Sequence, residues 1–450
     1  MRSWLACLVA LLGTPTVTAA SSPDAVRAGA QELPTTPSQF FDVRRVWNIE
    51  LSLSAKAWEE LQPQSIQQPS AVQPWSRFLA PEGERNGVAA ARGGIEFDYV
   101  HADLAINGHK FADVGLRYKG NGTFLNANGD KKPLKVQLDR YVRDQRMGGI
   151  TTLNLQNSVT DASFMNEALA YRLYRDAGVP SPRTGYARVS LSINGETPVY
   201  LGLYSISEGI EPEFFAGRNV PPGGAILKPS LQVPFTLIGE DWSDYRQAYD
   251  PKTDLTRAQK QRVIEFSRLV SNADDAEFGK RLPGYLDIDQ FARYFAVLAW
   301  LGNTDSLLRM GQNYYVYMRP NDQRLIFLPW DQDGSFGNFG RRRGDAAVSL
   351  DIAQPWTPGI RFLDRVMNVA AVREAYDRYM AEFSRTLFLP ERFAKQIEEI
   401  APVIRPAILD ESPWMADEFE RAVRGEAGIL PFARQRADFV NEQLQNTAQQ

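Results

Sequence analysis

The sequence predicts an α+β protein of two lobes: a small antiparallel β lobe that holds one key helix, and a larger, mainly helical lobe. Segments of alternating apolar and polar residues, joined by the turn signals Asn107-Gly108 and Asn194-Gly195, predict β-hairpins in the first half of the chain. From Trp242 onward, apolar residues recur at helical spacing instead. A chain of 450 residues, 44% of them hydrophobic, can bury a substantial core.

Residues 1–20 have the composition of a secretory signal peptide. A positively charged start is followed by an apolar core, Leu5–Leu12, and by small residues. That core is too short to span a membrane, and no later apolar run approaches the roughly 18 residues that a spanning helix needs. The one cysteine, Cys7, lies in this segment, so the mature chain has no disulfide and no cysteine-ligated metal. We expect a secreted, periplasmic or cell-envelope protein in which residues 21–45 form a flexible lead.

Charge and histidine content exclude several functional classes. A formal net charge of −4 argues against a nucleic-acid-binding protein that depends on bulk positive charge. The chain has two histidines, His101 and His109, which nearly excludes histidine-rich metal sites and histidine-based catalytic triads. Both are expected on a polar surface near a strand.

The small lobe is expected over residues 46–210. Its strands follow from the alternation of apolar residues: Val46–Leu53, Ile95–Ile106, Phe111–Tyr118, Pro133–Leu138, Ala187–Ile193 and Val199–Ile206. A short helix is expected at residues 55–61. Residues 62–94 are rich in Gln, Pro, Gly and Arg, and we interpret them as a long, partly mobile surface insertion.

A segment with two glycines, Lys119–Phe124, lies between two of these strands. A loop of this kind can lay backbone N–H groups over phosphates, with Lys119 as a nearby cation. A hairpin turn that needs glycine for a positive φ explains the same pattern and is the commoner case. Both interpretations stay open at this point.

Lys135 and Glu167 are candidates for positioning ATP. Alternation in the strand Pro133–Leu138 turns Lys135 away from the apolar face, and Glu167 lies on a predicted helix, Asp161–Tyr174. A strand lysine followed by a helix glutamate is the ion pair that positions ATP in kinases. Taken singly, each is equally explained as a charge at a strand edge or on a solvated helix face.

Two further charged residues follow where the chain leaves the small lobe. Glu208 stands at the exit, a position suited to contact adenine or to form a hinge. Lys228 follows a short apolar run and is either a second phosphate-binding cation or a lysine at a strand end. We include both in the candidate nucleotide site.

Two carboxylates end an apolar strand in the sequence FLPWDQDGSFG. Asp331 and Asp333 follow Leu325–Leu328 and precede a turn with glycine. Such a strand end can present oxygens to a hard cation, Mg²⁺ or Mn²⁺, that bridges them to phosphate. A solvated turn or a structural calcium site is the common alternative. A calcium-binding loop that starts at Asp331 would need Gly at its sixth position and Glu at its twelfth, where this chain has Phe336 and Arg342.

An ordered set of polar residues strengthens the case for a catalytic site. Asp305 and Asn313 precede a second strand, Tyr314–Met318, which leads to Asp331. Asp, Asn, a hairpin and Asp is the order of a kinase catalytic loop and its metal-binding segment. An apolar helix, Ile288–Leu301, runs directly into Asp305 and is expected to be its buried support.

The larger lobe is expected over residues 211–450. Helical spacing predicts a helix at 256–271 and a helical remainder over 360–445. The basic run Arg341–Arg343 is either a solvated loop or a clamp for an acidic substrate.

The chain resembles the spore-coat protein H (CotH) family of atypical protein kinases from about Val46 to Leu444. The motifs that carry the resemblance include LRYKGNGTF, KKPLKVQLD, YLGLYSISEGI, QNYYVYM and FLPWDQDGSFG. The resemblance implies a protein-kinase-like fold. It also implies ATP-dependent phosphorylation of serine or threonine in a protein substrate, outside the cytoplasm and with Mg²⁺ or Mn²⁺.

Within that resemblance, Asp305 corresponds to the catalytic-loop aspartate that orients the substrate hydroxyl. Asn313 and Asp331 correspond to the metal ligands, and Asp333 to a second acidic ligand or an orienting group. We infer from strand order that Lys135 and Glu167 form the ATP-positioning pair. The chain departs from the family at Gln312, where a histidine is frequent, and this departure puts activity in question.

Two other functions fit the same residues. One is an ATP-dependent transferase with a different product, such as nucleotidyl or amino-acid transfer. The other is a catalytically inactive surface or structural protein that binds partners or glycans, since ATP is scarce outside the cytoplasm.

Overall fold

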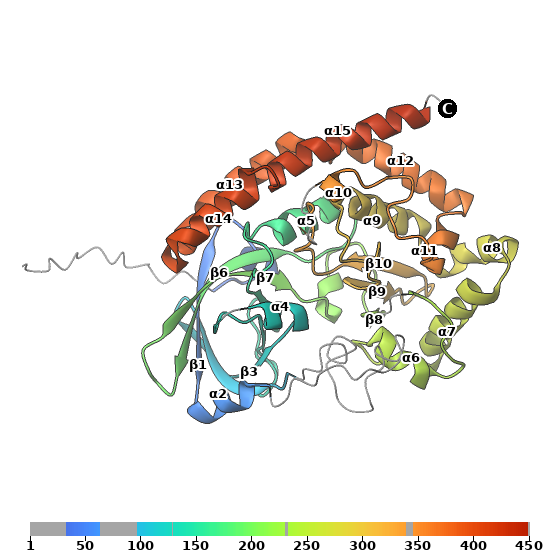
Figure 1. The fold of residues 1–450 in the computed structure, drawn as a ribbon. Coiled ribbons are helices and arrows are strands. Elements are labelled where there is room, and N and C mark those ends of the chain that lie inside the picture. Colours follow the sequence, from blue (N-terminus) through green and yellow to red (C-terminus); the bar gives the residue numbers. More distant parts are fainter. Residues whose placement is uncertain (1–32, 64–96, 128, 230–232, 339–344, 449–450) are drawn as a thin grey trace, which may run out of the picture. The chain divides into compact units, whose positions relative to one another are not determined.

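The computed structural model describes residues 33–63, 97–127, 129–229, 233–338 and 345–448 (Figure 1). From residue 33 onward the chain forms one compact unit of mixed α/β architecture. The expected signal peptide, most of the insertion at 62–94, and Arg341–Arg343 lie outside the described residues. The same holds for the first part of the expected lead, 21–32.

The described part of the lead is packed against the rest of the protein, which corrects the expectation of a flexible segment. Helix α1 (Pro37–Phe40) buries Phe40 completely, and the Phe40 carbonyl accepts a hydrogen bond of 2.8 Å from the indole N–H of Trp47. The Phe40 and Trp47 rings stack at 5.4 Å. Burial of these aromatic side chains outweighs the polar composition of the segment.

Seven strands form a closed barrel in the order β1-β2-β3-β4-β5-β7-β6. Their bounds are β1 Val46–Leu53, β2 Val100–Ile106, β3 His109–Tyr118, β4 Leu134–Gln137, β5 Thr152–Gln156, β6 Thr184–Ile193 and β7 Val199–Glu208. Pairing is antiparallel except between β1 and β6, which pair in parallel and close the barrel. The pairing is therefore antiparallel, as expected, except at this one pair of strands.

Side-chain alternation gives the barrel an apolar interior and one polar outer row. Leu134 and Val136 are buried in the barrel core, as the alternation predicts. The residue between them, Lys135, pairs with Arg117 on β3 and with Asn154 on β5. Directly paired residues lie on the same face of a sheet, so these three polar side chains share the outer face.

Short helices flank the barrel strands. Helix α2 (Ala55–Leu61) lies where the sequence predicts it, capped by Ser54. The glycine segment after β3 forms helix α4 (Asn121–Asn126), which begins after Gly120 at a φ of 66°. The segment is therefore helical rather than a hairpin turn, although Gly120 has the positive φ that the turn interpretation requires, and phosphate binding by its backbone N–H groups stays a prediction.

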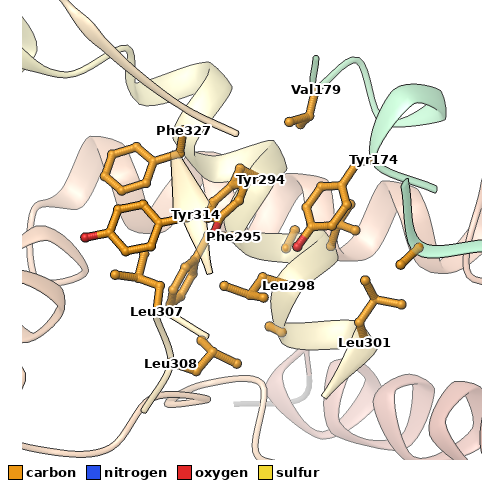
Figure 2. Packing of buried hydrophobic residues seen from close by; sticks show 14 of the residues in the cluster. Tyr174, Val179, Tyr294, Phe295, Leu298, Leu301, Leu307, Leu308, Tyr314 and Phe327 are labelled. Carbon is orange, nitrogen blue, oxygen red and sulfur yellow. The ribbon is translucent and has the colours of Figure 1, made fainter. Parts of the chain in front are cut away.

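Helix α5 (Asn166–Asp176) is the helix that carries Glu167. It begins five residues later than expected, because Asp161 folds back and its Oδ2 accepts the Asn166 N–H at 2.9 Å. Gly178, at a φ of 79°, ends the helix. The apolar side of α5 packs on α9 (Ile288–Leu301), where the Tyr174 and Tyr294 rings stack at 5.6 Å (Figure 2).

A second sheet of three strands lies beside the barrel, in the order β10-β9-β8. Its strands are β8 Ala225–Leu227, β9 Tyr314–Met318 and β10 Leu325–Pro329, and a 3₁₀ turn, η2 (Pro212–Phe215), connects it to β7. Alternate residues of the β9–β10 hairpin face two different apolar cores. Tyr314 and Phe327 belong to the large helical core and stack at 5.5 Å (Figure 2), whereas Tyr315 and Leu328 face a smaller core with Trp330.

The remaining elements are helical, as the periodicity predicts. They are α6 Trp242–Tyr249, α7 Arg257–Asn272, α8 Asp275–Tyr285, α10 Asp345–Val348, α11 Arg361–Val366, α12 Ala370–Thr386, α13 Pro390–Glu411, α14 Pro413–Arg424 and α15 Ile429–Ala448. Asp287 caps α9, which is buried along most of its length and so supports Asp305 as expected. Among the described helices, none combines the length and apolarity that crossing a membrane requires.

Candidate active site

Asn313 and Asp331 lie at the same end of the β9–β10 hairpin. Asn313 immediately precedes β9, and Asp331 is the second residue after β10. Between the two ends, the Trp330 N–H donates to the Asn313 carbonyl at 3.2 Å. Both residues have a left-handed backbone, with φ of 62° for Asn313 and 54° for Asp331. Asn and Asp tolerate this conformation better than most residues, and such strained positions cluster at functional sites.

Asp305 is held beside Asn313 by two hydrogen bonds. The Asn313 side-chain amide donates to the Asp305 carbonyl at 2.7 Å. The Gln312 amide donates to the Asp305 carboxylate at 2.6 Å. Gln312 thus provides a neutral donor to the candidate catalytic carboxylate.

Buried amides connect the Asp305 turn to the segment that carries Asp331. The Asn303 carboxamide accepts the Asp305 N–H at 3.1 Å and lies 3.5 Å from the Gln332 Oε1. Gln332 in turn donates to the Trp330 carbonyl at 2.9 Å. Asn303 and Gln332 are both fully buried, so they fix the two turns relative to each other.

Glu167 connects α5, β7 and the Asp331 segment. Its carboxylate accepts hydrogen bonds from the Tyr171 hydroxyl at 2.9 Å and from the Ser207 hydroxyl at 2.6 Å. The Tyr171 hydroxyl also accepts the Asp331 N–H at 3.0 Å. Burial raises the pKa of Glu167, and the nearby charge of Asp331 raises it further, while the Ser207 hydrogen bond and the Lys119 charge lower it.

Two half-buried lysines flank the ring of Trp330, next to Asp331. The Nζ atoms of Lys119 and Lys228 lie 5.7 and 5.6 Å from the ring centroid. Lys119 donates to the Gln156 side chain at 2.9 Å. Burial lowers the pKa of each lysine to about 8, and Asp331 counteracts this at both. The structure therefore brings Lys119, Lys228, Glu167 and Asp331 together.

The expected ion pair between Lys135 and Glu167 is not formed. Lys135 instead pairs with Glu211, with 3.8 Å between its Nζ and the Glu211 Oε1. The cation whose charge acts on Glu167 is Lys119, which follows the end of β3. Strand order alone misassigned the lysine, because Lys119 lies just beyond the end of β3, the strand that pairs with the strand of Lys135.

Asp333 is held as a structural part of this segment. Its carboxylate accepts a hydrogen bond from the Thr160 hydroxyl, and its carbonyl accepts one from the Asn166 amide at 2.8 Å. Burial and the charge of Asp331 raise the pKa of Asp333 well above its usual range. These contacts fit the expected role of an orienting group better than that of a metal ligand.

The carboxylate of Glu208 is fully engaged in ion pairs. Oε1 contacts Arg183 and Oε2 contacts Arg218, each at 2.5 Å. Its two oxygens are thus occupied by guanidinium groups, so the expectation that this side chain contacts adenine is not supported. The Glu208 N–H donates to the Arg183 carbonyl at 3.0 Å, which fixes the point where the chain leaves the barrel.

Asn313 and Asp331 suit a magnesium site that a nucleotide completes. Among the described residues, no group of three or more His, Cys, Asp or Glu side chains is arranged to hold a metal ion. Within the same part of the chain, no hydrogen bond or ion pair engages the Asp331 carboxylate. Mg²⁺ commonly binds one or two carboxylates together with substrate phosphates and water, so these residues fit Mg²⁺ bound with a phosphate ligand.

The spacing of four residues between Glu167 and Tyr171 predicts that both share one face of the helix, and the structure shows them hydrogen-bonded at 2.9 Å. Other supporting residues were missed from the sequence. Asn303, Gln332 and Ser207 gave no sequence signal, because polar residues beside strands and turns are ordinarily solvent-exposed. Their role depends on burial, which the fold alone determines.

Comparison with known proteins connects the chain to one family. A family model described as CotH kinase protein matches residues 116–444. The inner spore coat protein H of Bacillus subtilis (strain 168) is 21% identical over 353 residues, which cover 77% of this chain and 91% of that protein. An inner spore coat protein H-like protein of the same organism is 24% identical over 340 residues, covering 73% of this chain and 95% of the relative.

Solved structures give weaker similarities. One is the Shewanella oneidensis MR-1 toxin–antitoxin complex of HipA, HipB and operator DNA. Its HipA chain has 12% sequence identity to this chain and a TM-score of 0.33, and the match covers 70% of this chain and 60% of HipA. The Helicobacter pylori proinflammatory kinase CtkA has 10% identity and a TM-score of 0.26, covering 74% of this chain and 95% of CtkA. Both TM-scores are low.

Proposed function

The chain belongs to the CotH kinase protein family, and on that premise we propose that it is an exported protein kinase with a protein-kinase-like, two-lobed fold. It transfers the γ-phosphate of ATP to serine or threonine of a protein substrate. The composition of residues 1–20 supports export. The names of the two Bacillus relatives, both inner spore coat proteins, support association with the cell envelope or a coat.

Each candidate residue has a role in this proposal. Lys119 and Lys228 bind the phosphates of ATP, and Lys119 takes the place that strand order gave to Lys135. Asn313 and Asp331 hold Mg²⁺ or Mn²⁺, which neutralises phosphate charge when it is bound. Asp305 orients the acceptor hydroxyl, and Gln312 positions Asp305 through its hydrogen bond of 2.6 Å.

One observation supports the proposal most. Lys119 and Lys228 both lie at the ring of Trp330, and the charge of Asp331 acts on both, yet neither lysine forms an ion pair with a carboxylate in the described part of the chain. Half-buried ammonium groups without a carboxylate partner carry a desolvation cost, and a triphosphate would compensate it. Phosphoryl transfer needs this kind of positioning and charge neutralisation more than it needs covalent chemistry.

Phosphoryl transfer from labelled ATP tests the function. The full-length protein should label a generic acceptor such as casein or myelin basic protein, or itself, with Mg²⁺ or Mn²⁺ present and not in EDTA. Asp331→Ala should lower the rate by about 10²- to 10³-fold, the size expected when a group that stabilises transferred charge is removed. Asp322→Asn, in the turn at the opposite end of the hairpin, is the matched control and should retain activity.

The outcomes separate the competing functions. Labelling that persists in EDTA or in Asp331→Ala would contradict the proposal. ATP binding without transfer to any acceptor would indicate a catalytically inactive binding protein. Intact mass spectrometry identifies a different transferase, because the added mass would be that of a nucleotidyl or aminoacyl group rather than a phosphoryl group.

A further inference from the structure

A pocket of about 400 Å³ lies at the end of α5 away from Glu167. Its walls include Arg175 and Val179 at the end of the helix, Arg218 and Val220 after η2, and Arg319 and Ile326 of the β9–β10 hairpin. None of the residues that line it belongs to the candidate active site. A volume of about this size is in the range of small-molecule sites.

One wall of the pocket carries an excess of positive charge. Arg175 and Arg218 line the pocket, and the charges of both Arg218 and Arg183 act on Arg175. Two carboxylates act on Arg175 as well: that of Asp176, which forms an ion pair with Arg392, and that of Glu208. Arg183 and Arg218 take both oxygens of the Glu208 carboxylate. Arg175 is left with one contact, a hydrogen bond from Nη1 to the Pro182 carbonyl, and has no carboxylate in ion-pair distance among the described residues.

The acidic residue of the lining, Asp287, does not offset this charge. Arg319 donates to Asp287 at 2.6 Å and also pairs with Asp322, so Asp287 already has its own cation. Burial lowers the pKa of Arg175 to about 10, which reflects the cost of holding this charge away from water; the charges of Asp176 and Glu208 counteract this, and those of Arg218 and Arg183 add to it. A bound anion would remove that cost.

Part of the remaining lining is apolar, and Ser181, Asn219 and Gln290 add polar side chains to it. Val179 and Ile326 are almost completely buried, at 1% and 2% exposure, and Val220 packs against the small core that contains Ile326. A free inorganic anion would leave this apolar lining without a partner. The lining therefore favours a ligand with an apolar body beside its charged group.

We propose that this pocket binds a small ligand that has an oxyanion head, phosphate or carboxylate, on an apolar body, with Arg175 as its anchor. A guanidinium group matches the planar pair of oxygens in either head and can bind both at once. Arg218 lies beside Arg175 and adds charge to the same wall. The inference does not depend on the proposed kinase activity, because it uses none of the residues of the candidate active site.

Calorimetry on the full-length protein tests the site, with phenyl phosphate and benzoate as probes and benzyl alcohol as the neutral control. At least one anionic probe should bind, and benzyl alcohol should not. The better anionic probe identifies the head group. Arg175→Gln should weaken binding at least tenfold. Arg172→Gln is the matched control, since Arg172 lies one turn earlier on α5 and pairs with Glu399 at 3.0 Å.

A second variant protects the test against loss of folding. Asn219 is an exposed lining residue with a φ of 56°, a conformation that aspartate tolerates. Asn219→Asp adds a carboxylate at the edge of the pocket, and it should also weaken the anionic probes several-fold. Absence of binding to the wild type, or unchanged binding in both Arg175→Gln and Asn219→Asp, would overturn the inference. Binding that only Lys228→Gln removes would overturn it too, because the probe would then occupy the candidate active site.

Discussion

Ser207 and Glu208 are neighbours on β7, yet they belong to two buried charge clusters of opposite kind. Glu208 forms short ion pairs with two arginines, so each carboxylate oxygen contacts a guanidinium group. Ser207 donates at 2.6 Å to Glu167, which lies in the cluster of Lys119, Lys228 and Asp331. In that second cluster the charged groups contact hydroxyls, amides and an aromatic ring, with no direct ion pair between lysine and carboxylate.

The difference shows which cluster serves the fold and which can serve a ligand. A buried carboxylate that is saturated by guanidinium groups has no capacity left for another partner, and its loss damages the fold. Half-buried lysines held near, but not against, a carboxylate lower stability and retain capacity for phosphate. The predictions below test this contrast through stability, pH dependence and nucleotide binding.

The largest expected effect on stability is at Glu208. Glu208→Gln leaves Arg183 and Arg218 without their shared carboxylate, and should lower the free energy of unfolding by about 3 kcal/mol, the cost typical of breaking a buried ion pair. Urea unfolding followed by circular dichroism measures it.

The matched control is Glu167→Gln, a change of the same chemistry in the other cluster. Burial and the charge of Asp331 raise the pKa of Glu167, so removal of its charge should change stability by less than about 1 kcal/mol. Equal losses in the two variants would show that the clusters do not differ in the way proposed.

The next effect concerns Lys228 and its pH dependence. Burial lowers the Lys228 pKa to about 8 from the usual 10.5, so the unfolded chain holds this proton more firmly than the folded one. The destabilisation is complete below pH 8 and disappears as pH rises from 8 to 10.5. Lys228→Met should therefore be more stable than the wild type by about 1–2 kcal/mol at pH 7, allowing for partial solvent exposure.

Thermal unfolding of both proteins between pH 7 and pH 10 checks the sign. The advantage of Lys228→Met should shrink as pH rises, because the wild-type lysine loses its charge in the folded state first. A constant difference across this range, or one that grows with pH, would contradict the lowered pKa. Because the wild type and Lys228→Met share all their other titratable groups, the difference in stability between them cancels the contribution of those groups.

Much of the local structure follows from the sequence, because it depends on neighbouring residues. The Asn107-Gly108 turn appears as predicted, with φ of 47° and 84°, and α9 is buried along the stripe that its spacing predicts. Strand β1 and helix α2 also match their predicted ranges. In these segments the propensity of the chain and the final fold agree.

Features that depend on distant parts of the chain could not be predicted in the same way. The parallel pairing of β1 with β6 joins residues far apart in sequence, and no local pattern specifies it. The same limit explains why the sequence predicted Lys135, rather than Lys119, as the lysine near Glu167. Lys135 is on the outer face of β4, Lys119 follows the end of the neighbouring strand β3, and the position of α5 decides which one lies near Glu167.

The central claim is that Lys119 and the Asp331 segment form a nucleotide site, and Mg²⁺–ATP affinity in two matched lysine variants tests it most directly. Isothermal titration calorimetry should show binding to the wild type, at least tenfold weaker binding to Lys119→Gln, and binding within about twofold of wild type for Lys135→Gln, since Lys135 is already paired with Glu211. No binding to the wild type, or a larger loss in Lys135→Gln than in Lys119→Gln, would contradict the account.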